Sequence, residues 1–149
     1  MIVPDWGIRE GQPVSPFCER TVFNGMTFGL SCAGYDIRID QDVILEPQQF
    51  SLASSFEQFN MPTNWLGYVK DKSSWARLGL AVQNTVIEPG WRGFLTLELT
   101  NHSKETINIA KGSPIAQIVF HVLMGMPEKT YTGKYQDQPR GPQKSIVEG

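Results

Sequence analysis

The chain has 149 residues, 40% of them hydrophobic and 19% charged, with a formal net charge of −2 at pH 7, which is typical of one globular domain over residues 1–149 that folds without a metal or a disulfide. The low charge and the lack of a basic cluster argue against a nucleic-acid partner. No apolar run approaches the roughly 20 residues that cross a bilayer and the amino end lacks a signal-peptide pattern, so we expect a cytoplasmic protein without a membrane partner.

Proline and glycine recur at short intervals, and most segments between them have the length of a β-strand. This pattern predicts an all-β barrel or sandwich without an internal repeat or a second domain. The expected strands, in chain order, are Tyr35–Ile39, Gln49–Ser54, Leu66–Val69, Leu80–Asn84, Phe94–Thr100, Thr106–Ile109 and Ile115–Val122.

Asp36 enters the first of these strands directly after the small-residue turn of S-C-A-G-Y-D-I-R. A carboxylate in this place is suited to hold Mg²⁺ through water at a phosphate site. The alternative is a turn residue that accepts hydrogen bonds from backbone N–H groups.

One short helix is expected near Ser73–Leu78, with Ser73 or Ser74 as its N-cap. In the segment K-D-K-S-S-W-A-R-L-G-L, Arg77 follows the serines on the same helical face. A helix amino end, hydroxyl groups and a guanidinium together suit phosphate oxygens. The segment therefore predicts a triphosphate site, and a capped helix with a solvated arginine is the alternative.

The turn V-I-E-P-G-W-R-G places Pro89 and Gly90 directly before Trp91. An aromatic ring beside such a turn can close over a sugar or a base, and it can equally cap the core. Glu88 in the same turn is either a functional group or a surface charge.

Glu98 lies in the middle of the expected strand Phe94–Thr100, in which Leu95, Leu97 and Leu99 share the opposite face. A carboxylate in a strand centre is disfavoured by β-propensity and costly if it is buried without a partner. Glu98 therefore either has a chemical role or faces solvent on an amphipathic strand.

From Pro127 onward the chain is polar, which predicts a mobile tail over about residues 127–149. The segment Y-T-G-K-Y-Q-D-Q offers one lysine, two tyrosines and two glutamines that can fold over a ligand. A disordered terminus is the alternative.

The cysteines and histidines do not indicate zinc. Cys18 and Cys32 are expected as free thiols in a cytoplasmic chain, although sequence alone leaves a disulfide open. His102 and His121 lack the H-x-E and P-C-x-x-C patterns of zinc deaminases.

In sequence order, the segments G-L-S-C-A-G-Y-D-I-R, K-S-S-W-A-R-L-G-L, T-V-I-E-P-G-W-R-G, L-T-L-E-L-T-N and Y-T-G-K-Y-Q-D-Q resemble the motifs of dCTP deaminases in the dUTPase-like superfamily. The resemblance implies a distorted β-barrel or jelly-roll, assembled as a homotrimer with active sites between subunits and closed by the tail. It implies zinc-independent hydrolysis of dCTP to dUTP and ammonia, which feeds dUTP and dTTP synthesis, with Mg²⁺ bound to the triphosphate.

The resemblance also implies roles for single residues. Glu98 is the expected general acid/base, and Ser73 is expected to orient the attacking water or bind phosphate. The deoxyribose is expected near Trp91. The expected substrate-binding residues are Lys72, Ser74, Arg77, Asn84, Thr85, Val86, Trp91, Tyr131, Lys134 and Gln138.

Glu98 in L-E-L-T-N and the G-K-Y-Q-x-Q-like tail favour the deaminase branch over the dUTPase branch. Glu88, however, occupies the place of the water-activating Asp of dUTPases, so a dUTPase or a bifunctional enzyme is the alternative. A non-catalytic nucleotide-binding regulator is a more distant one. Gln83 and Asn84 depart from the N-V-T pattern expected before the turn.

Overall fold

The computed structural model describes residues 1–147 and confirms the all-β prediction. Three curled sheets enclose one core: a six-stranded sheet in the order β2-β3-β4-β12-β7-β9, a four-stranded sheet in the order β1-β6-β10-β8, and the pair β11-β5. The elements in chain order are α1 (Asp5–Gly11), β1 (Val14–Ser15), β2 (Thr21–Phe23), β3 (Met26–Ser31), β4 (Gly34–Arg38), β5 (Val43–Leu45), β6 (Phe50–Asn60), β7 (Trp65–Asp71), α2 (Ser73–Ala76), β8 (Leu80–Val82), β9 (Val86–Ile87), β10 (Arg92–Asn101), β11 (Ile107–Ile109) and β12 (Pro114–Val122).

The prediction of one helix is wrong, because α1 is a second helix near the amino end. Its signal in the sequence is weak: Pro4 is the N-cap without a side-chain hydrogen bond, and Ile8 is its one buried residue. Among residues 1–147, no helix is long and apolar enough to cross a membrane. Cys18 and Cys32 are free, as predicted.

The predicted N-cap of α2 is also wrong. Lys72 occupies the N-cap position without a side-chain cap, and Ser73 is the first helical residue. The turn is held from its other side, since the indole Nε1 of Trp75 donates a hydrogen bond of 2.7 Å to the carbonyl oxygen of Pro114. The two serine side chains therefore stay exposed rather than closing the helix end.

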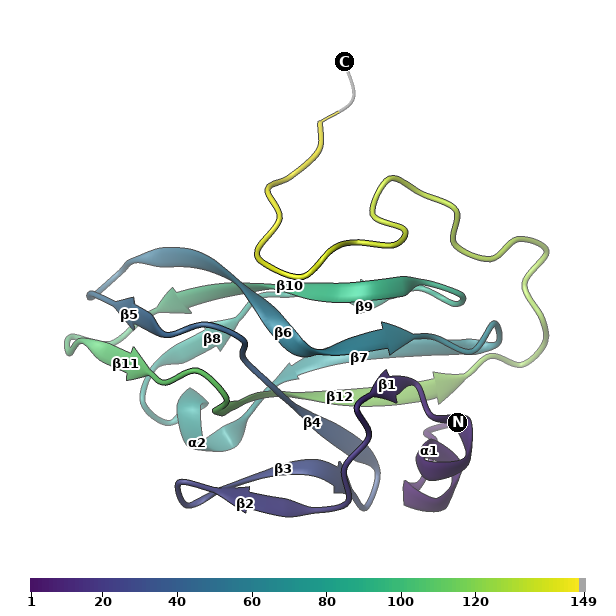
Figure 1. The fold of residues 1–149 in the computed structure, drawn as a ribbon, viewed down its shortest axis with the longest axis horizontal. Helices are drawn as coiled ribbons and strands as arrows, with labels where there is room; N and C mark the ends of the chain where they lie inside the picture. Colours follow the sequence, from purple (N-terminus) through teal and green to yellow (C-terminus); the bar gives the residue numbers. More distant parts are fainter. Residues whose placement is uncertain (148–149) are drawn as a thin grey trace.

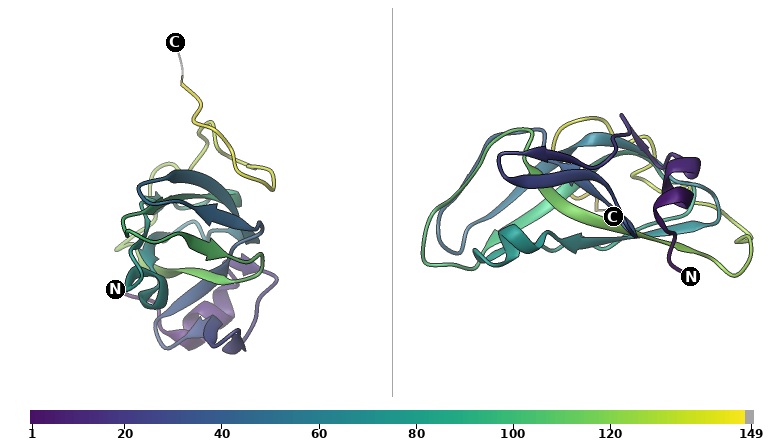
Figure 2. Two further views of the ribbon diagram at one scale, coloured as in Figure 1. Left: turned by 90° about the vertical axis from the view of Figure 1, so that its left-hand side faces the viewer. Right: turned by 90° about the horizontal axis from the view of Figure 1, so that it is seen from below.

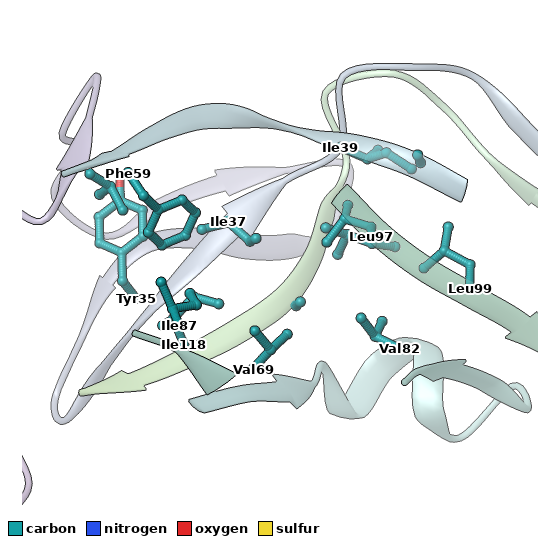
Figure 3. Packing of buried hydrophobic residues seen from close by; sticks show 14 of the residues in the cluster. Tyr35, Ile37, Ile39, Phe59, Val69, Val82, Ile87, Leu97, Leu99 and Ile118 are labelled. Carbon is teal, nitrogen blue, oxygen red and sulfur yellow. The ribbon is translucent and has the colours of Figure 1, made fainter. Parts of the chain in front are cut away.

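The core lies between the sheets, as Figure 3 shows. Leu97 and Leu99 of β10 are fully buried and lie on the same side of the core as Ile39, which directly follows β4. Full burial of one such side chain contributes about 1.5–3 kcal/mol relative to exposure. Because β10 alternates regularly, its even-numbered side chains, including Glu98, face away from this core.

Strand β6 is longer than predicted and pairs with β10 in two segments. The register changes between Phe94↔Gln58 and Thr96↔Ser54, so the three residues Ser55–Glu57 lie opposite Leu95 alone. The extra β6 residues turn toward β4: Glu57 is fully buried and accepts a hydrogen bond of 3.0 Å from Arg38 Nε. This irregularity fastens the two large sheets to each other.

The chain changes sheets between β8 and β9. Strand β8 pairs with β10 through Val82↔Leu99, whereas β9 pairs with β7 through Val86↔Tyr68. Val82 and Val86 are only a few residues apart, so the wall of the barrel opens where β8 ends. The predicted strand Leu80–Asn84 therefore stops at Val82, before this opening.

Candidate functional site

A cavity of about 560 Å³ lies at the opening between β9 and β10. Its floor is apolar, because Val69, Ile87 and Leu95 of the core border it where the sheets separate. Strand β6 adds Phe50 and Leu52. A mainly apolar cavity with a few polar groups is the usual form of a small-molecule site. The full lining is Phe50, Leu52, Val69, Asn84, Thr85, Val86, Ile87, Glu88, Trp91, Leu95, Thr96, Glu98, Tyr131, Tyr135, Gln138, Gln143, Lys144 and Ser145.

Glu98 borders this cavity from β10, directly across the strand pair from Leu52. Burial raises the pKa of the Glu98 carboxyl above its ordinary value. Among residues 1–147 no salt bridge includes Glu98. A half-buried carboxyl with a raised pKa and no cationic partner is suited to proton transfer at this place.

Three consecutive predicted residues, Asn84, Thr85 and Val86, also border the cavity. They form the segment that crosses from β8 to β9. The Asn84 side chain binds the backbone of β10, with hydrogen bonds to the Glu98 N–H and the Thr96 carbonyl oxygen. These residues therefore form one wall of the opening beside Glu98.

Trp91 belongs to the core and also borders the cavity, so its contact with a sugar or a base stays a prediction. The side chain is buried and its ring centroid lies 6.0 Å from that of Phe59, so it belongs to the core. It also borders the cavity, and its Nε1 donates a hydrogen bond of 2.7 Å to the carbonyl oxygen of Tyr135. Glu88 is exposed at the same rim.

The tail predicted after Pro127 lies along the outer side of β10, away from β2 and β3 (Figures 1 and 2). Gln138 forms a parallel bridge with Gly93, and its Nε2 donates a hydrogen bond of 2.7 Å to the carbonyl oxygen of Phe94. Tyr131 borders the cavity and accepts a hydrogen bond of 3.0 Å from the Tyr135 N–H at its hydroxyl. The tail therefore forms one side of the site.

Gly93 allows this close approach of the tail. A Cβ at this position would lie 2.7 Å from the Gln138 nitrogen, and the backbone has φ of 150°. Glycine adopts such a conformation without steric cost. Any larger residue at Gly93 would displace the tail from β10.

Lys134 does not border the cavity. It is exposed, and its Nζ donates a hydrogen bond to the carbonyl oxygen of Ile146. The same nitrogen lies 5.5 Å from the centroid of the Tyr135 ring. In this structure Lys134 binds the tail itself.

The remaining predicted residues form a second group around α2. Lys72 Nζ lies 3.1 Å from Asp36 Oδ2, and both side chains are largely buried. Ser73, Ser74 and Arg77 are exposed beside them. None of these five residues borders the cavity that contains Glu98. One chain therefore separates the predicted phosphate-binding residues from the predicted catalytic carboxyl.

Asp36 is a poor direct ligand for a metal ion as it stands. Burial raises the pKa of its carboxyl, and Lys72, which acts in the opposite direction, already neutralises the charge. Among residues 1–147, no three His, Cys, Asp or Glu side chains are grouped as a metal site. The water-mediated role of Asp36 stays a prediction.

Ten lining residues were not predicted as site residues. Four of them lie on β7, β9 and β10: Val69, Ile87, Leu95 and Thr96. Phe50 and Leu52 share one face of a strand, which is also the pattern of core residues, and their place opposite β10 depends on strand register. The other four belong to the tail and follow or lie between predicted tail residues: Tyr135, Gln143, Lys144 and Ser145. The second tyrosine of Y-T-G-K-Y-Q-D-Q is the one available signal among them.

A family model and curated relatives both indicate the same family. A family model for dCTP deaminase-like domains matches residues 31–123. The dCTP deaminase of Pyrococcus horikoshii is 32% identical over 155 residues, with 94% of each chain covered. The dCTP deaminase of a Sulfurovum species is 33% identical over 172 residues, covering 91% of this chain and 92% of the relative.

Three solved structures that share the fold are dUTPases. The dUTPase of Staphylococcus bacteriophage 80alpha has a TM-score of 0.60 at 18% identity, covering 80% of this chain and 92% of that one. The EIAV dUTPase has a TM-score of 0.57 at 23% identity, covering 68% and 84%. A dUTPase mutant of the S. aureus phage phi11, described as revealing a structural Mg(II) ion, has a TM-score of 0.56 at 20% identity, covering 68% and 84%. At these identities the likeness shows the fold.

Proposed function

Because the chain belongs to the dCTP deaminase-like family, we propose that it hydrolyses dCTP to dUTP and ammonia, with Glu98 as its general acid/base. The observation that carries the proposal is the Glu98 carboxyl, which borders an apolar cavity and has a pKa raised by burial. Relatives named dCTP deaminase that match nearly the whole chain support it. The product would feed dUTP and dTTP synthesis, and the proposed location is the cytoplasm.

In the proposed reaction, water attacks C4 of cytosine, N3 gains a proton, and the C4–N bond breaks to release ammonia. The Glu98 carboxylate accepts a proton from the water and donates it to N3. It then carries the proton of the new C4 hydroxyl to the amino group, so that ammonia leaves as the C4 carbonyl forms. Proton transfer by a positioned side chain contributes roughly 10²- to 10⁴-fold to a rate. The raised pKa of Glu98 supports this role, because it brings the protonated form closer to neutral pH. Ser73 is proposed to orient the water or to bind phosphate.

The base is proposed to lie on the apolar floor of the cavity, with the segment Asn84–Val86 facing its polar edge. The deoxyribose is proposed to lie near Trp91, whose bulk would exclude a 2′-hydroxyl. Tyr131 and Gln138 would close the site from the tail. Lys134 would have to leave its contact with Ile146 to bind substrate.

We propose that the triphosphate binds Lys72, Ser74 and Arg77 of a second copy of the chain, in a homotrimer with its sites between subunits. The separation of these residues from the Glu98 cavity supports this arrangement, because the base pocket and the predicted phosphate donors of α2 do not lie together in one subunit. Closed cyclic assemblies place one patch of each subunit against a different patch of the next.

Mg²⁺ is proposed to accompany the triphosphate. The structural Mg(II) ion of the phage phi11 dUTPase supports an ion on this fold. Among residues 1–147, no three His, Cys, Asp or Glu side chains are grouped as ligands for it, and Asp36 is paired with Lys72. The proposed reaction therefore takes no step through the ion and none through zinc.

A second candidate activity is the cleavage of dUTP, either in place of deamination or together with it. Glu88 favours it, because this exposed carboxylate borders the same cavity as Glu98. A nucleotide-binding regulator without catalysis is the more distant alternative.

One experiment separates these functions. The purified protein is incubated with dCTP and, separately, with dUTP in the presence of Mg²⁺, and ammonia, pyrophosphate and nucleotides are measured. We expect ammonia and dUTP from dCTP. Pyrophosphate from dUTP would indicate dUTP cleavage, together with deamination if ammonia is also released and in its place if it is not. Nucleotide binding without either product would indicate the regulator.

A further inference from the structure

The side-chain amide of Asn84 occupies the place of a missing strand partner beside Glu98. Its Oδ1 accepts a hydrogen bond of 2.9 Å from the Glu98 N–H, and its Nδ2 donates one of 2.7 Å to the Thr96 carbonyl oxygen. One amide thus binds both backbone groups, much as the peptide of a neighbouring strand would do.

The amide is needed here because β8 ends too early. The last backbone contact on this side is the hydrogen bond of 2.9 Å from the Gln83 N–H to the Glu98 carbonyl oxygen. The chain then leaves for β7, where Val86 pairs with Tyr68. Without Asn84, the Glu98 N–H and the Thr96 carbonyl oxygen would face the opening without a protein partner. Backbone groups in a half-buried strand are costly to leave unpaired.

Glu98 is held on its other side by β6, where it pairs with Leu52. Asn84 holds the strand on the side where β8 has ended, because its Oδ1 accepts the hydrogen bond from the Glu98 N–H. A carboxyl that transfers protons must stay within a fraction of an ångström of its productive position. The position of the Glu98 carboxyl therefore depends on how firmly the Glu98 backbone is held.

We propose that Asn84 is a positioning residue for Glu98, rather than a group that recognises the substrate base. This inference rests on the proposed deaminase function and assigns Asn84 a different role from the one its place in the sequence suggests. Both amide atoms of Asn84 already bind β10, so only the second N–H and the second oxygen lone pair remain for a base, and the side chain cannot turn toward a base without abandoning both hydrogen bonds. Recognition of the base edge then falls to the peptide groups of Thr85 and Val86, which border the same cavity.

The test compares Asn84→Ala and Asn84→Asp with Gln83→Ala. Gln83 is the matched control, because its side chain also spans the gap between β8 and β10, accepting a hydrogen bond of 2.7 Å from Thr100 Oγ1. Its contact with Glu98 uses backbone atoms, which the substitution leaves in place. For each protein, kcat and KM for ammonia release from dCTP are measured. Hydrogen exchange at the Glu98 N–H is measured without ligand.

We expect Asn84→Ala to lower kcat by about 10- to 100-fold, the range in which small misplacements of a reacting group act. KM for dCTP should change by less than about threefold, because the substrate contacts remain. Exchange at the Glu98 N–H should accelerate. Gln83→Ala should leave kcat and KM within about twofold of the wild type.

Asn84→Asp keeps an acceptor for the Glu98 N–H but loses the donor to Thr96 and places a second carboxylate near Glu98. Exchange protection at Glu98 should be retained while kcat stays low. A rise in KM with unchanged kcat and unchanged exchange in Asn84→Ala would overturn the inference and restore a substrate-binding role. Loss of protection in Asn84→Asp equal to that in Asn84→Ala would also overturn it.

The exchange measurement keeps this inference separate from the proposed function. If the wild-type protein releases no ammonia from dCTP, the proposed function fails. The hydrogen bond from Glu98 to Asn84 is still tested by exchange in that case. Unchanged exchange in Asn84→Ala would then refute the contact on its own.

Discussion

The indole Nε1 of Trp91 donates a hydrogen bond of 2.7 Å to the carbonyl oxygen of Tyr135, and so joins the turn before β10 to the C-terminal tail. Gln136 strengthens the junction, since its Nε2 donates to the Gly90 carbonyl oxygen at 3.0 Å and its Oε1 accepts from the Arg92 N–H at 2.7 Å. Because these contacts lie beside the cavity, the position of the tail and the shape of the site are linked.

Trp91→Phe should keep the packing against Phe59 but release the tail. One hydrogen bond of this kind contributes about 0.5–1.5 kcal/mol net, so trypsin should cleave the tail several-fold faster. The melting temperature should also fall, because Trp91 is buried in the core and phenylalanine is smaller. Mass spectrometry of timed digests measures the cleavage. Trp75→Phe is the control, because it removes an equal indole-to-carbonyl bond, to Pro114, far from the tail. Equal tail cleavage in wild type and Trp91→Phe would contradict the link.

Glu98→Gln should lower the rate of ammonia release by at least about 100-fold, the lower end of what general acid/base catalysis contributes. Binding of dCTP should persist, because the amide has the same size as the carboxyl. Ammonia assays and calorimetric titration with dCTP check the two parts. Glu88→Gln is the matched control at the same rim: it should leave ammonia release intact and reduce any release of pyrophosphate from dUTP.

The raised pKa of Glu98 also predicts how stability depends on pH. Burial disfavours the ionised carboxyl in the folded state, so the folded protein binds this proton to a higher pH than the unfolded chain does. The wild type should therefore lose stability relative to Glu98→Gln as pH rises from the ordinary carboxyl pKa through the raised folded value. Melting temperatures of both proteins at pH 4 and pH 8 test the sign. The predicted sign is refuted if the melting temperature of the wild type rises relative to that of the variant between pH 4 and pH 8.

Mixing two inactive variants tests the shared site. Arg77→Ala should weaken dCTP binding without loss of stability, because Arg77 is exposed. If Glu98 and Arg77 of different subunits form one site, random mixed trimers of Glu98→Gln and Arg77→Ala should regain about one quarter of the sites. Ammonia release after unfolding and refolding the two together measures this recovery. Separately refolded proteins are the control, and no recovery would place both residues in one subunit's site.

Leu97→Ala should destabilise the fold by about 2–5 kcal/mol, because Leu97 is fully buried between the sheets and its removal leaves a cavity. Urea unfolding measures the change. Val22→Ala on β2 is the control, since Val22 is 61% exposed and should cost within about 0.5 kcal/mol. A similar loss in both variants would contradict the assigned core.

The strands that were predictable are those with a clear alternation or a long apolar run, of which Phe94–Thr100 is the best example. Its regular period correctly predicts that Glu98 faces away from Leu97 and Leu99. The helix α1 was not predictable, because it buries one residue and has no polar cap. Strand β9 was not predictable either, because its two residues gain their partners only through β7.

Seven of the predicted site residues border the cavity, but their arrangement could not be predicted from the sequence. Motif order alone suggested Glu98, Trp91 and Arg77, yet nothing in the sequence states that the first two share a cavity and the third does not. That division depends on where β8 leaves its sheet. The role of Asn84 also depends on this point, since nothing in the sequence indicates that this asparagine binds Thr96 and Glu98, which are 12 and 14 residues away.

The extra residues of β6 opposite Leu95 restrict how this strand can change in length. Between the two paired segments, β6 advances from Ser54 to Gln58 while β10 advances from Thr96 to Phe94. Strand β6 therefore has two more residues than β10 in this stretch. Because two is an even number, Leu52 keeps its place on the cavity side while Ala53 stays in the core. An insertion or deletion of one residue would exchange these two faces over half the strand. Functional homologues should therefore differ here by even numbers of residues, and a library of one- and two-residue insertions would show that parity directly.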